Sequence, residues 1–311
     1  MSRKALLACV CFLTVATAAF AEKITMKPAW KAGETKNYSL EHYTDTAKTS
    51  STDVTINVLE KTASKYKISC TYSNEQDYTG MEEMAKSLLG AETYDKIAHF
   101  SPIYSVSLNG KILSVDNFNE YRKILEVPQD TSNNLGGKLN GLMASLLKSM
   151  TAPNEKSFMD MNMQEILAMH KYFGKEYDTK VDKRGTTNIS LCTMILENVK
   201  SSTKVSKEKG KVTLVTTAKL PEKECLNALT AWMKKYMIEI AKEMGVPSDD
   251  PKMKEQIDKA VKEFKEKKMT AESTETAVFD AKTGWMISYE SIQTLNSTDG
   301  TKSETLIVKA K

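Results

Sequence analysis

The chain has 311 residues, of which 41% are hydrophobic and 27% charged, with only 13 glycines and 7 prolines. These proportions are those of an ordinary globular protein, and they exclude collagen-like and low-complexity chains. Lysine and arginine together number 44 against 40 acidic residues, which gives a net charge of +4. That excess is too small for the basic surface of a nucleic-acid-binding protein, so nucleic acid is not expected as a partner.

The first 21 residues have the pattern of a secretory signal peptide. Two basic residues precede an apolar run over residues 5–18, and residues 19–21 are Ala-Phe-Ala, a small-x-small cleavage site. We expect cleavage after Ala21, so that the mature chain begins at Glu22 and is secreted or periplasmic. No later stretch approaches the roughly 18 consecutive apolar residues of a membrane-spanning helix.

Three cysteines remain in the mature chain, namely Cys70, Cys192 and Cys225. Export permits disulfides, but three thiols allow at most one intramolecular bridge, and the pairing is left open. Cys70 and Cys192 lie in strand-like segments, where a cysteine commonly serves as a small buried hydrophobic residue. No CxxC spacing is present, so neither a thioredoxin-like redox centre nor a zinc site is indicated.

The mature chain begins with strands. Apolar residues alternate with polar ones over residues 35–72, which predicts three antiparallel strands with one apolar face. Polar turns are expected over residues 45–53 and 61–65. The predicted apolar face consists of Tyr38, Leu40, His42, Val54, Ile56, Val58, Tyr66, Ile68, Cys70 and Tyr72. Such a one-sided sheet needs a cover over that face.

A helix over residues 81–89 is predicted next, ended by Gly90. Residues 103–115 read as a β-hairpin, since Asn109-Gly110 favours a type I′ turn. A short helix over 116–125, an exposed loop over 126–137 and a helix over 139–150 follow. Ser157 is then expected to cap a further helix that ends at Phe173-Gly174.

The second half of the mature chain repeats this order. Strands are predicted over residues 177–220, and Pro221 opens a long helix that ends at Gly245. Asp250-Pro251 begins the next helix, whose charged residues pair on a solvated face. Strands return over 274–311, with a glycine turn at 282–284 and a last strand over 304–309.

This order predicts an α+β fold, in which one or more curved antiparallel sheets are covered by amphipathic helices. Two related β-α-β units are possible, the first over residues 22–174 with a helical insert and the second over 175–311. Each contains a hairpin whose glycine turn is followed by apolar residues. We expect both units to pack as one globular body.

The sequence contains no pattern typical of an enzyme. GxSxG, HExxH, GxxxxGK[ST] and GxGxxG motifs are absent, and nothing in the spacing of His42, His99 and His170 brings them together. We therefore expect a non-enzymatic protein with no cofactor, no metal and no catalytic residues.

Methionine is unusually frequent, with 17 in the chain, and it is concentrated in the predicted helices. Flexible thioethers suit an adaptable apolar binding surface. The predicted ligand-lining residues are Met143, Leu146, Met150, Met163, Trp232 and Met237. The same stripes would equally fill a solid core between helices and sheet, because both roles need the same periodicity.

A second methionine pattern suggests a different ligand. Met159, Met161 and Met163, with His170 downstream, supply soft ligands of the kind that bind Cu(I). On a helix, however, Met161 projects away from the other two, so three sulfurs converge only if the segment is extended.

By the order of these segments the mature chain resembles the LolA/LppX-like group of exported carriers. The resemblance rests on the signal over residues 1–21, the strands over 35–72, the Asn109-Gly110 hairpin and the covering helices. It implies a strongly curved antiparallel sheet that holds an apolar or lipid-like ligand beneath helices. The alternatives are an envelope structural or protein-interaction protein with a filled core, and a methionine-rich copper-binding protein. The sequence names neither ligand, protein partner nor oligomeric state.

Overall fold

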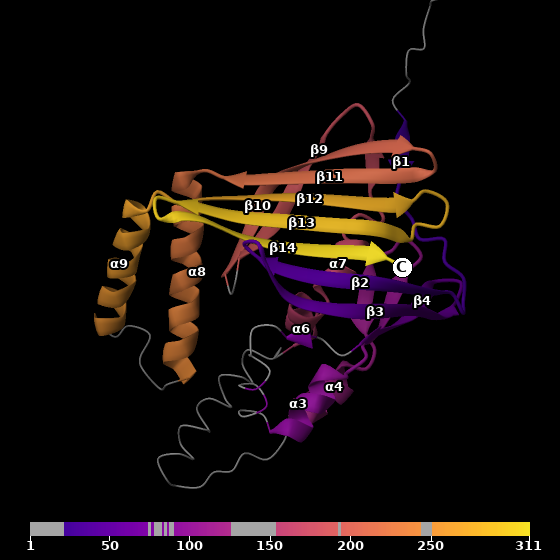
Figure 1. Ribbon diagram of the computed structural model, residues 1–311, viewed down its shortest axis with the longest axis horizontal. Helices are drawn as coiled ribbons and strands as arrows, with labels where there is room; N and C mark the ends of the chain where they lie inside the picture. Colours follow the sequence, from indigo (N-terminus) through magenta and orange to yellow (C-terminus); the bar gives the residue numbers. More distant parts are fainter. Residues whose placement is uncertain are drawn as a thin grey trace, which may run out of the picture.

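The architecture in Figure 1 comes from a computed structural model of the chain. The described residues are 22–73, 76–77, 83, 86, 90–125, 154–191, 194–243 and 251–311. Among these residues, no helix has the length and apolar character needed to cross a membrane.

One antiparallel sheet organises the described chain. Its strands follow the order β7-β6-β4-β3-β2-β14-β13-β12-β11-β10-β9, and β5 pairs with β3 beside this path. The strands are β2 (Thr35–Thr44), β3 (Ala47–Lys61), β4 (Lys65–Tyr72), β5 (Gln76–Asp77), β6 (Ile103–Ser107), β7 (Ile112–Val115), β9 (Lys183–Leu191), β10 (Met194–Glu208), β11 (Lys211–Leu220), β12 (Thr270–Asp280), β13 (Met286–Ser297) and β14 (Gly300–Ala310). A separate pair is formed by β1 (Lys23–Thr25) and β8 (Glu176–Asp178).

The two halves of the chain meet in the middle of this sheet. β2, the first long strand, pairs with β14, the last one, over seven residue positions from Thr44 to Tyr38. Strands from the predicted units 22–174 and 175–311 therefore share one hydrogen-bonded layer. Whether those units arose by duplication stays a prediction.

At the β9 edge the sheet bends toward the face that carries the buried core residues, which is called the inner face below. The backbone N–H of Ser190 on β9 donates to Oε1 of Gln293 on β13. Thr187, also on β9, donates through Oγ1 to Oε1 of Glu275 on β12 at 3.3 Å. Both contacts skip the intervening strands β10 and β11, so the antiparallel sheet is curved and the predicted fold class is confirmed.

Helices cover parts of the inner face and of one end of the sheet. They are α3 (Ala91–Ala98), α4 (Phe118–Leu125), α6 (Glu155–Asn162), α7 (Gln164–His170), α8 (Glu222–Glu243) and α9 (Pro251–Glu266). In Figure 1, α6 and α7 lie behind the strands, α3 and α4 lie below them, and α8 and α9 stand side by side at one end. α8 contacts β10, β11 and β12, and α9 packs on α8.

The alternating faces of the first strands were predicted well, because a half-buried strand must place every second residue in the core. Tyr38 and Leu40 on β2 are buried, as are the corresponding residues of β3 and β4. The predicted starts of the two long helices after Pro221 and at Pro251 are also confirmed.

The expected turn over residues 45–53 was wrong. β3 already begins at Ala47, which pairs with Thr44 and leaves a two-residue connection. Asp45 adopts a φ of 55° there, and its carboxylate accepts the backbone N–H of Ser303. Cross-strand hydrogen bonds thus hold a Thr- and Ser-rich stretch as strand, despite its loop-like composition. β14 likewise begins at Gly300, four residues before its predicted start.

The hairpin over residues 103–115 is confirmed, but its predicted type I′ turn is wrong. That turn needs a positive φ at both central residues, and only Gly110 has one, at 87°. The N–H of Gly110 donates to the carbonyl of Ser107, and the N–H of Ser107 donates to that of Lys111. This is the three-residue loop with a glycine bulge.

The helices differ from the prediction in three ways. The cap of α6 is Asn154, whose Oδ1 accepts the N–H of Ser157 at 2.9 Å, so Ser157 is not the cap. The helix then breaks at Met163, with φ −137°, which separates α6 from α7. α3 was not predicted, and Gly90 directly precedes it.

Several predicted elements lie outside the described residues. They are the loop over 126–137 and the helix over 139–150, with most of the helix over 81–89. Cys192 lies outside them as well, whereas Cys70 and Cys225 are buried free thiols.

Among the described residues, the core consists of one large hydrophobic cluster and two smaller ones. The large cluster joins β2, β3, β4 and β6 to α6 and α7, with Trp30 fully buried inside it. The second cluster lies where α8 meets the sheet and includes Cys225 and Leu229. The third is centred on Met233 and Ile257, between α8 and α9. The large cluster fixes α6 and α7 against the first strands of the sheet.

Candidate functional site: a cavity between the sheet and the short helices

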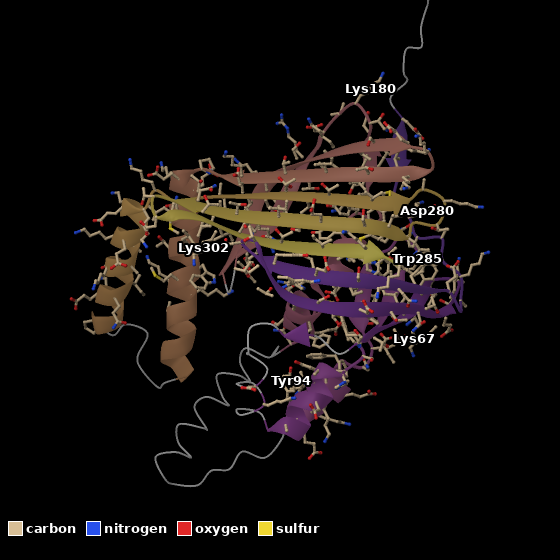
Figure 2. The ribbon with its side chains drawn as sticks, viewed as in Figure 1. Lys67, Tyr94, Lys180, Asp280, Trp285 and Lys302 are labelled. Carbon is tan, nitrogen blue, oxygen red and sulfur yellow. The ribbon has the colours of Figure 1, made fainter. Side chains whose placement is uncertain are left out.

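A cavity of about 860 Å³ lies between the inner face of β2–β4 and the helices α3, α4, α6 and α7. Its volume is within the usual range for small-molecule sites, about 300–1,000 Å³. The lining residues are Leu40, His42, Thr52, Tyr72, Ser73, Lys86, Tyr94, Asp95, Ile97, Ala98, His99, Phe100, Pro102, Tyr121, Phe158, Asn162, Gln164, Glu165 and Glu304. Figure 2 labels Tyr94, on the helix that forms the outer wall below the sheet.

A cluster of aromatic rings lies on the apolar side of the cavity; Tyr121 and Phe158 are only 2% and 1% exposed, and Phe100 is its partly exposed ring. The ring centroids of Tyr121 and Phe158 are 4.6 Å apart, and Phe100 lies 5.2 Å from Tyr121 and 5.8 Å from Phe158. Phe118 extends the cluster behind them. These rings come from α4, α6 and the segment after α3, so three short elements meet in one aromatic cluster.

The sheet supplies a wall that changes from apolar to polar along the strands. Leu40 and His42 are successive inward residues of β2. His42 pairs with Leu306 on β14, which places Glu304 diagonally opposite it on the same face. Along β2, the cavity therefore passes from the hydrophobic core toward an imidazole and a carboxylate.

A polar wall comes from the junction of α6 and α7. The break at Met163 begins α7 with Gln164 and Glu165, and the helix N-terminus favours a negative charge there. Glu165 is only 8% exposed, and the hydroxyl of Tyr72 donates a hydrogen bond to its carboxylate. Burial, together with the negative charge of Glu165, raises the pKa of Tyr72 far above its usual range. The tyrosine thus stays a neutral donor.

The outer wall is the short helix α3. It has no buried residue, and its Tyr94 and Ile97 face the cavity. The ammonium group of Lys86 lies 5.2 Å from the centre of the Tyr94 ring. His99, at the C-terminal end of α3, shares a 2.8 Å hydrogen bond with the carbonyl of Asp95. The wall therefore combines apolar contact with basic side chains.

A second aromatic cluster, beside the cavity, is closed. Trp30 stacks on Trp285 at 4.6 Å and meets Phe173 and His170 edge-on at 5.7 Å. The Nδ1–H of His170 donates to the carbonyl of Gly110 at 2.8 Å, and burial lowers the histidine pKa to about 4. His170 thus fastens the β6–β7 turn to α7, which is a structural role.

A buried ion pair connects the end of α7 to β12, in the second half of the sheet. The ammonium of Lys171 lies 2.6 Å from the carboxylate of Glu275 on β12, which is 4% exposed. The hydroxyls of Tyr172 and Thr187 also donate to this carboxylate, at 3.2 Å and 3.3 Å. These donors together compensate the burial of the charge, so this cluster fixes the curl of the sheet around α7.

The structure places the predicted ligand-lining residues in different surroundings. Met163 is fully buried in the large cluster, whereas Trp232 packs against the small cluster between α8 and α9, so these two do not share a wall. Met143, Leu146 and Met150 lie outside the described residues, as does the side chain of Met237. The predicted set as a whole therefore stays a prediction.

The copper hypothesis also stays a prediction. Met163 is buried among apolar side chains, Met159 packs against the same cluster, and the side chain of Met161 is outside the described part. Within the described ranges, no group of three or more His, Cys, Asp or Glu residues is arranged to hold a metal ion.

Sequence reasoning missed the residues that do line the cavity. His42 and His99 contribute to the same cavity, although they are 57 positions apart in the chain. The alternation in β2 gave the inward direction of His42, but only the tertiary fold brings α3 opposite that strand. Glu165 gave no signal, because a single acidic residue in the first turn of a helix is common.

Comparisons with known proteins identify no family for this chain. No model of a known protein family matches the chain, and no curated protein matches its sequence. One similar solved structure, titled "Lipid-protein interactions in lipovitellin", has a TM-score of 0.35 and 10% identity over 90% of this chain. The chain spans only 25% of that one.

Another similar structure is a conserved protein of unknown function with a hot dog fold from Alicyclobacillus acidocaldarius. Its TM-score is 0.12 at 8% identity, covering 91% of this chain and 81% of the other. Both TM-scores are too low to inform the fold or function of this chain, so a functional assignment depends on the geometry of the cavity.

Proposed function

We propose that this chain is an exported, non-enzymatic protein that binds an apolar or lipid-like small molecule between its sheet and its helices. The observation that carries the proposal is the cavity of about 860 Å³, whose apolar side includes the partly exposed Ile97 and Phe100. Concave pockets of this size, with apolar surface for the ligand and polar groups that orient it, are typical small-molecule sites. The resemblance to LolA/LppX-like carriers fits this proposal and stays a prediction.

The cavity favours a binding protein over an envelope structural protein with a filled core. The inner face of β2–β4 is covered by short helices that leave space next to Leu40 and Thr52. Elsewhere on the same face, the Trp30 cluster fills the space with its own rings. A chain selected only for a solid interior would gain contact energy by filling both regions.

Contacts of Glu22 support export with cleavage after Ala21. The backbone nitrogen of Glu22 donates to Oγ1 of Thr179 at 3.2 Å, and its carboxylate pairs with Lys207. These contacts would hold the first residue of the mature chain beside β1 and β8. Intact-mass measurement of protein recovered from the exported fraction should give a chain that begins at Glu22; a mass that includes residues 1–21 would contradict cleavage.

The binding proposal is tested on the mature chain, purified without detergent. Native mass spectrometry should show an adduct of one small molecule per chain, which organic extraction releases chemically unchanged. After extraction, the neutral apolar dye N-phenyl-1-naphthylamine should bind saturably, at one molecule per chain. An empty chain that takes up no dye would overturn the proposal, and recovery of a chemically converted ligand would contradict the non-enzymatic role.

A further inference from the structure

We propose that Lys171, Lys175 and Lys183 form a binding site for a phosphate group, either free or as a phosphate monoester. The three lysines come from the end of α7, from the segment between α7 and β8, and from the start of β9. None of them lines the cavity beside α3. The site is therefore separate from the proposed binding function, and failure of either proposal leaves the other intact.

The floor of the site is the inner face of β9, next to Glu275. Lys183, Gly185 and Thr187 alternate along β9 and therefore share this face. Thr187 is buried, whereas Gly185 is exposed. Among the described residues, a Cβ on Gly185 would approach only the hydroxyl of Ser201, at 3.8 Å. The face of β9 is thus uncovered between Lys183 and Thr187.

The lysines carry an excess of two positive charges over the acidic group beside them. The ammonium of Lys171 lies 2.6 Å from the carboxylate of the buried Glu275 and donates to Oγ1 of Thr187 at 2.8 Å. Lys171 and Glu275 neutralise each other, so the charges of Lys175 and Lys183 remain. Both of these side chains reach solvent. A phosphate dianion would balance the excess and accept charge-assisted hydrogen bonds from them.

Lys175 lies close enough to the other two lysines to interact with their charges. Partial burial, followed by the positive charges of Lys171 and Lys183, lowers the pKa of Lys175, and the charge of Glu275 opposes this effect. Among the described residues, the ammonium of Lys175 has no hydrogen-bond or ion-pair partner. An anion between Lys175 and Lys183 would relieve their repulsion and supply the missing partner.

The acidic residues of β8 face away from this position. Glu176 and Asp178 lie on the face of β8 opposite the buried Tyr177, and Glu176 pairs with Lys23 at 2.9 Å. Lys183 lies on the other side, with its ammonium 5.0 Å from the centre of the Tyr177 ring. It donates one N–H to the backbone carbonyl of Glu176 at 2.8 Å, which leaves two N–H groups for a ligand.

Titration of inorganic phosphate into the mature chain tests the site. At pH 8 and constant ionic strength, with chloride as the balancing anion, calorimetry should show one phosphate bound per chain with a Kd of about 1 mM or tighter. A parallel titration of glycerol phosphate distinguishes the two sources of the group. Tighter binding than inorganic phosphate would identify a monoester as the ligand, and equal or weaker binding would identify free phosphate. No saturable binding of either anion would overturn the proposal.

The variant Lys175→Gln separates this site from a general attraction of anions. It removes the lysine that has no partner and should weaken phosphate binding at least about fivefold. Lys180→Gln is the matched control, because it removes the same charge from the connection between β8 and β9. Figure 2 shows Lys180 at the outer tip of that connection, pointing away from the sheet. Its Kd should stay unchanged within about 1.5-fold. Equal weakening in the two variants would overturn the site.

Acetylation of the unmodified chain gives a second readout. Phosphate bound against Lys175 should slow its reaction with acetic anhydride at least about twofold, while the exposed Lys180 reacts at the same rate with and without phosphate. Peptide mass spectrometry measures both rates. Lack of protection of Lys175 at saturating phosphate would contradict the assignment of the site to this lysine.

Discussion

Two aromatic clusters cover neighbouring parts of the same sheet face: the rings around Phe158 border the cavity, whereas those around Trp30 pack directly on one another. The Trp30 cluster is closed by the segment 22–34, which runs along the end of the sheet and hydrogen-bonds to Lys175, Thr283 and Val58. The Phe158 cluster is covered by short helices, and α3 among them has no buried residue. Figure 2 labels one residue of each region, Trp285 in the closed cluster and Tyr94 over the cavity.

The difference between the two regions indicates that the covering element, more than residue type, decides whether the interior is solid. An extended segment brings backbone close to the sheet, as where the carbonyl of Lys27 would lie 2.7 Å from a Cβ on Gly284. Short helices contact their neighbours through long side chains and therefore stand farther off. We expect the Trp30 cluster to contribute more to the free energy of unfolding, and the region around Phe158 to bind the ligand.

Truncation of Trp30 should give the largest loss of stability. The side chain is fully buried among Tyr66, Phe173 and Trp285, so Trp30→Ala should lower the free energy of unfolding by about 4 kcal/mol. Phe100→Ala, on the open cluster, should cost only about 1–2 kcal/mol because its ring is partly exposed. Urea unfolding measures both; equal losses would show that the two clusters do not differ in packing.

Protonation of His170 should destabilise the closed cluster in mild acid. Burial lowers its pKa from 6.5 to about 4, so the unfolded chain binds the proton more readily. Stability contributed by the neutral imidazole is full above pH 6.5 and falls by up to about 3 kcal/mol as the pH approaches 4.

The variant His170→Gln isolates that effect, because its amide can still donate to the carbonyl of Gly110 but does not titrate. The difference in unfolding free energy between pH 7 and pH 4.5 should shrink relative to the unmodified chain. An identical pH dependence in both proteins would assign the acid sensitivity to other groups.

Two glycines with similar backbone angles should respond differently to alanine. Gly110 and Gly210 have φ of 87° and 76°, but a Cβ on Gly110 would lie 2.2 Å from Cβ of Phe173, whereas nothing lies within 4 Å at Gly210. Gly110→Ala should cost about 2–3 kcal/mol, from strain and steric overlap, and Gly210→Ala about 1 kcal/mol, from strain alone. Thermal unfolding of the two variants should separate them; equal shifts would mean that the hairpin does not press on Phe173, in the turn after α7.

The smallest effect is expected on α3. Lys96 and Glu92 form an exposed i,i+4 ion pair at 2.7 Å, and such pairs stabilise a helix by about 0.3–0.5 kcal/mol. Lys96→Ala should therefore leave the free energy of unfolding unchanged within about 0.5 kcal/mol and the dye affinity unchanged within about twofold. A larger effect on dye binding would indicate that this pair controls the outer wall.

Local patterns predicted much of this fold and little of the site. The alternation from Tyr38 to Tyr72 predicted which residues of β2, β3 and β4 face inward, and proline marked the starts of the two long helices correctly. The pairing of β2 with β14 could not be predicted, because it joins residues some 260 positions apart without a local signal.

The lining of the cavity depends on such distant pairings. Glu304 reaches the cavity only because β14 lies beside β2, and Glu165 only because the helix breaks at Met163. The spacing of the methionines predicted apolar helix faces. It could not show whether those faces line a ligand cavity or fill a solid core. Trp232 packs against the small cluster between α8 and α9, whereas Met163 is buried in the large cluster, and the predicted ligand-lining set stays a prediction.

The most direct test of the central claim fills the cavity from the sheet side. Thr52 points into the cavity from β3, whereas its neighbour Ser51 lies on the outer face of the same strand. Titration of N-phenyl-1-naphthylamine into Thr52→Trp should show binding weakened by tenfold or more, about 1.4 kcal/mol, while Ser51→Trp binds like the unmodified chain. Equal dye affinity in the two folded variants would contradict the account, because the cavity beside Thr52 would then not be the binding site.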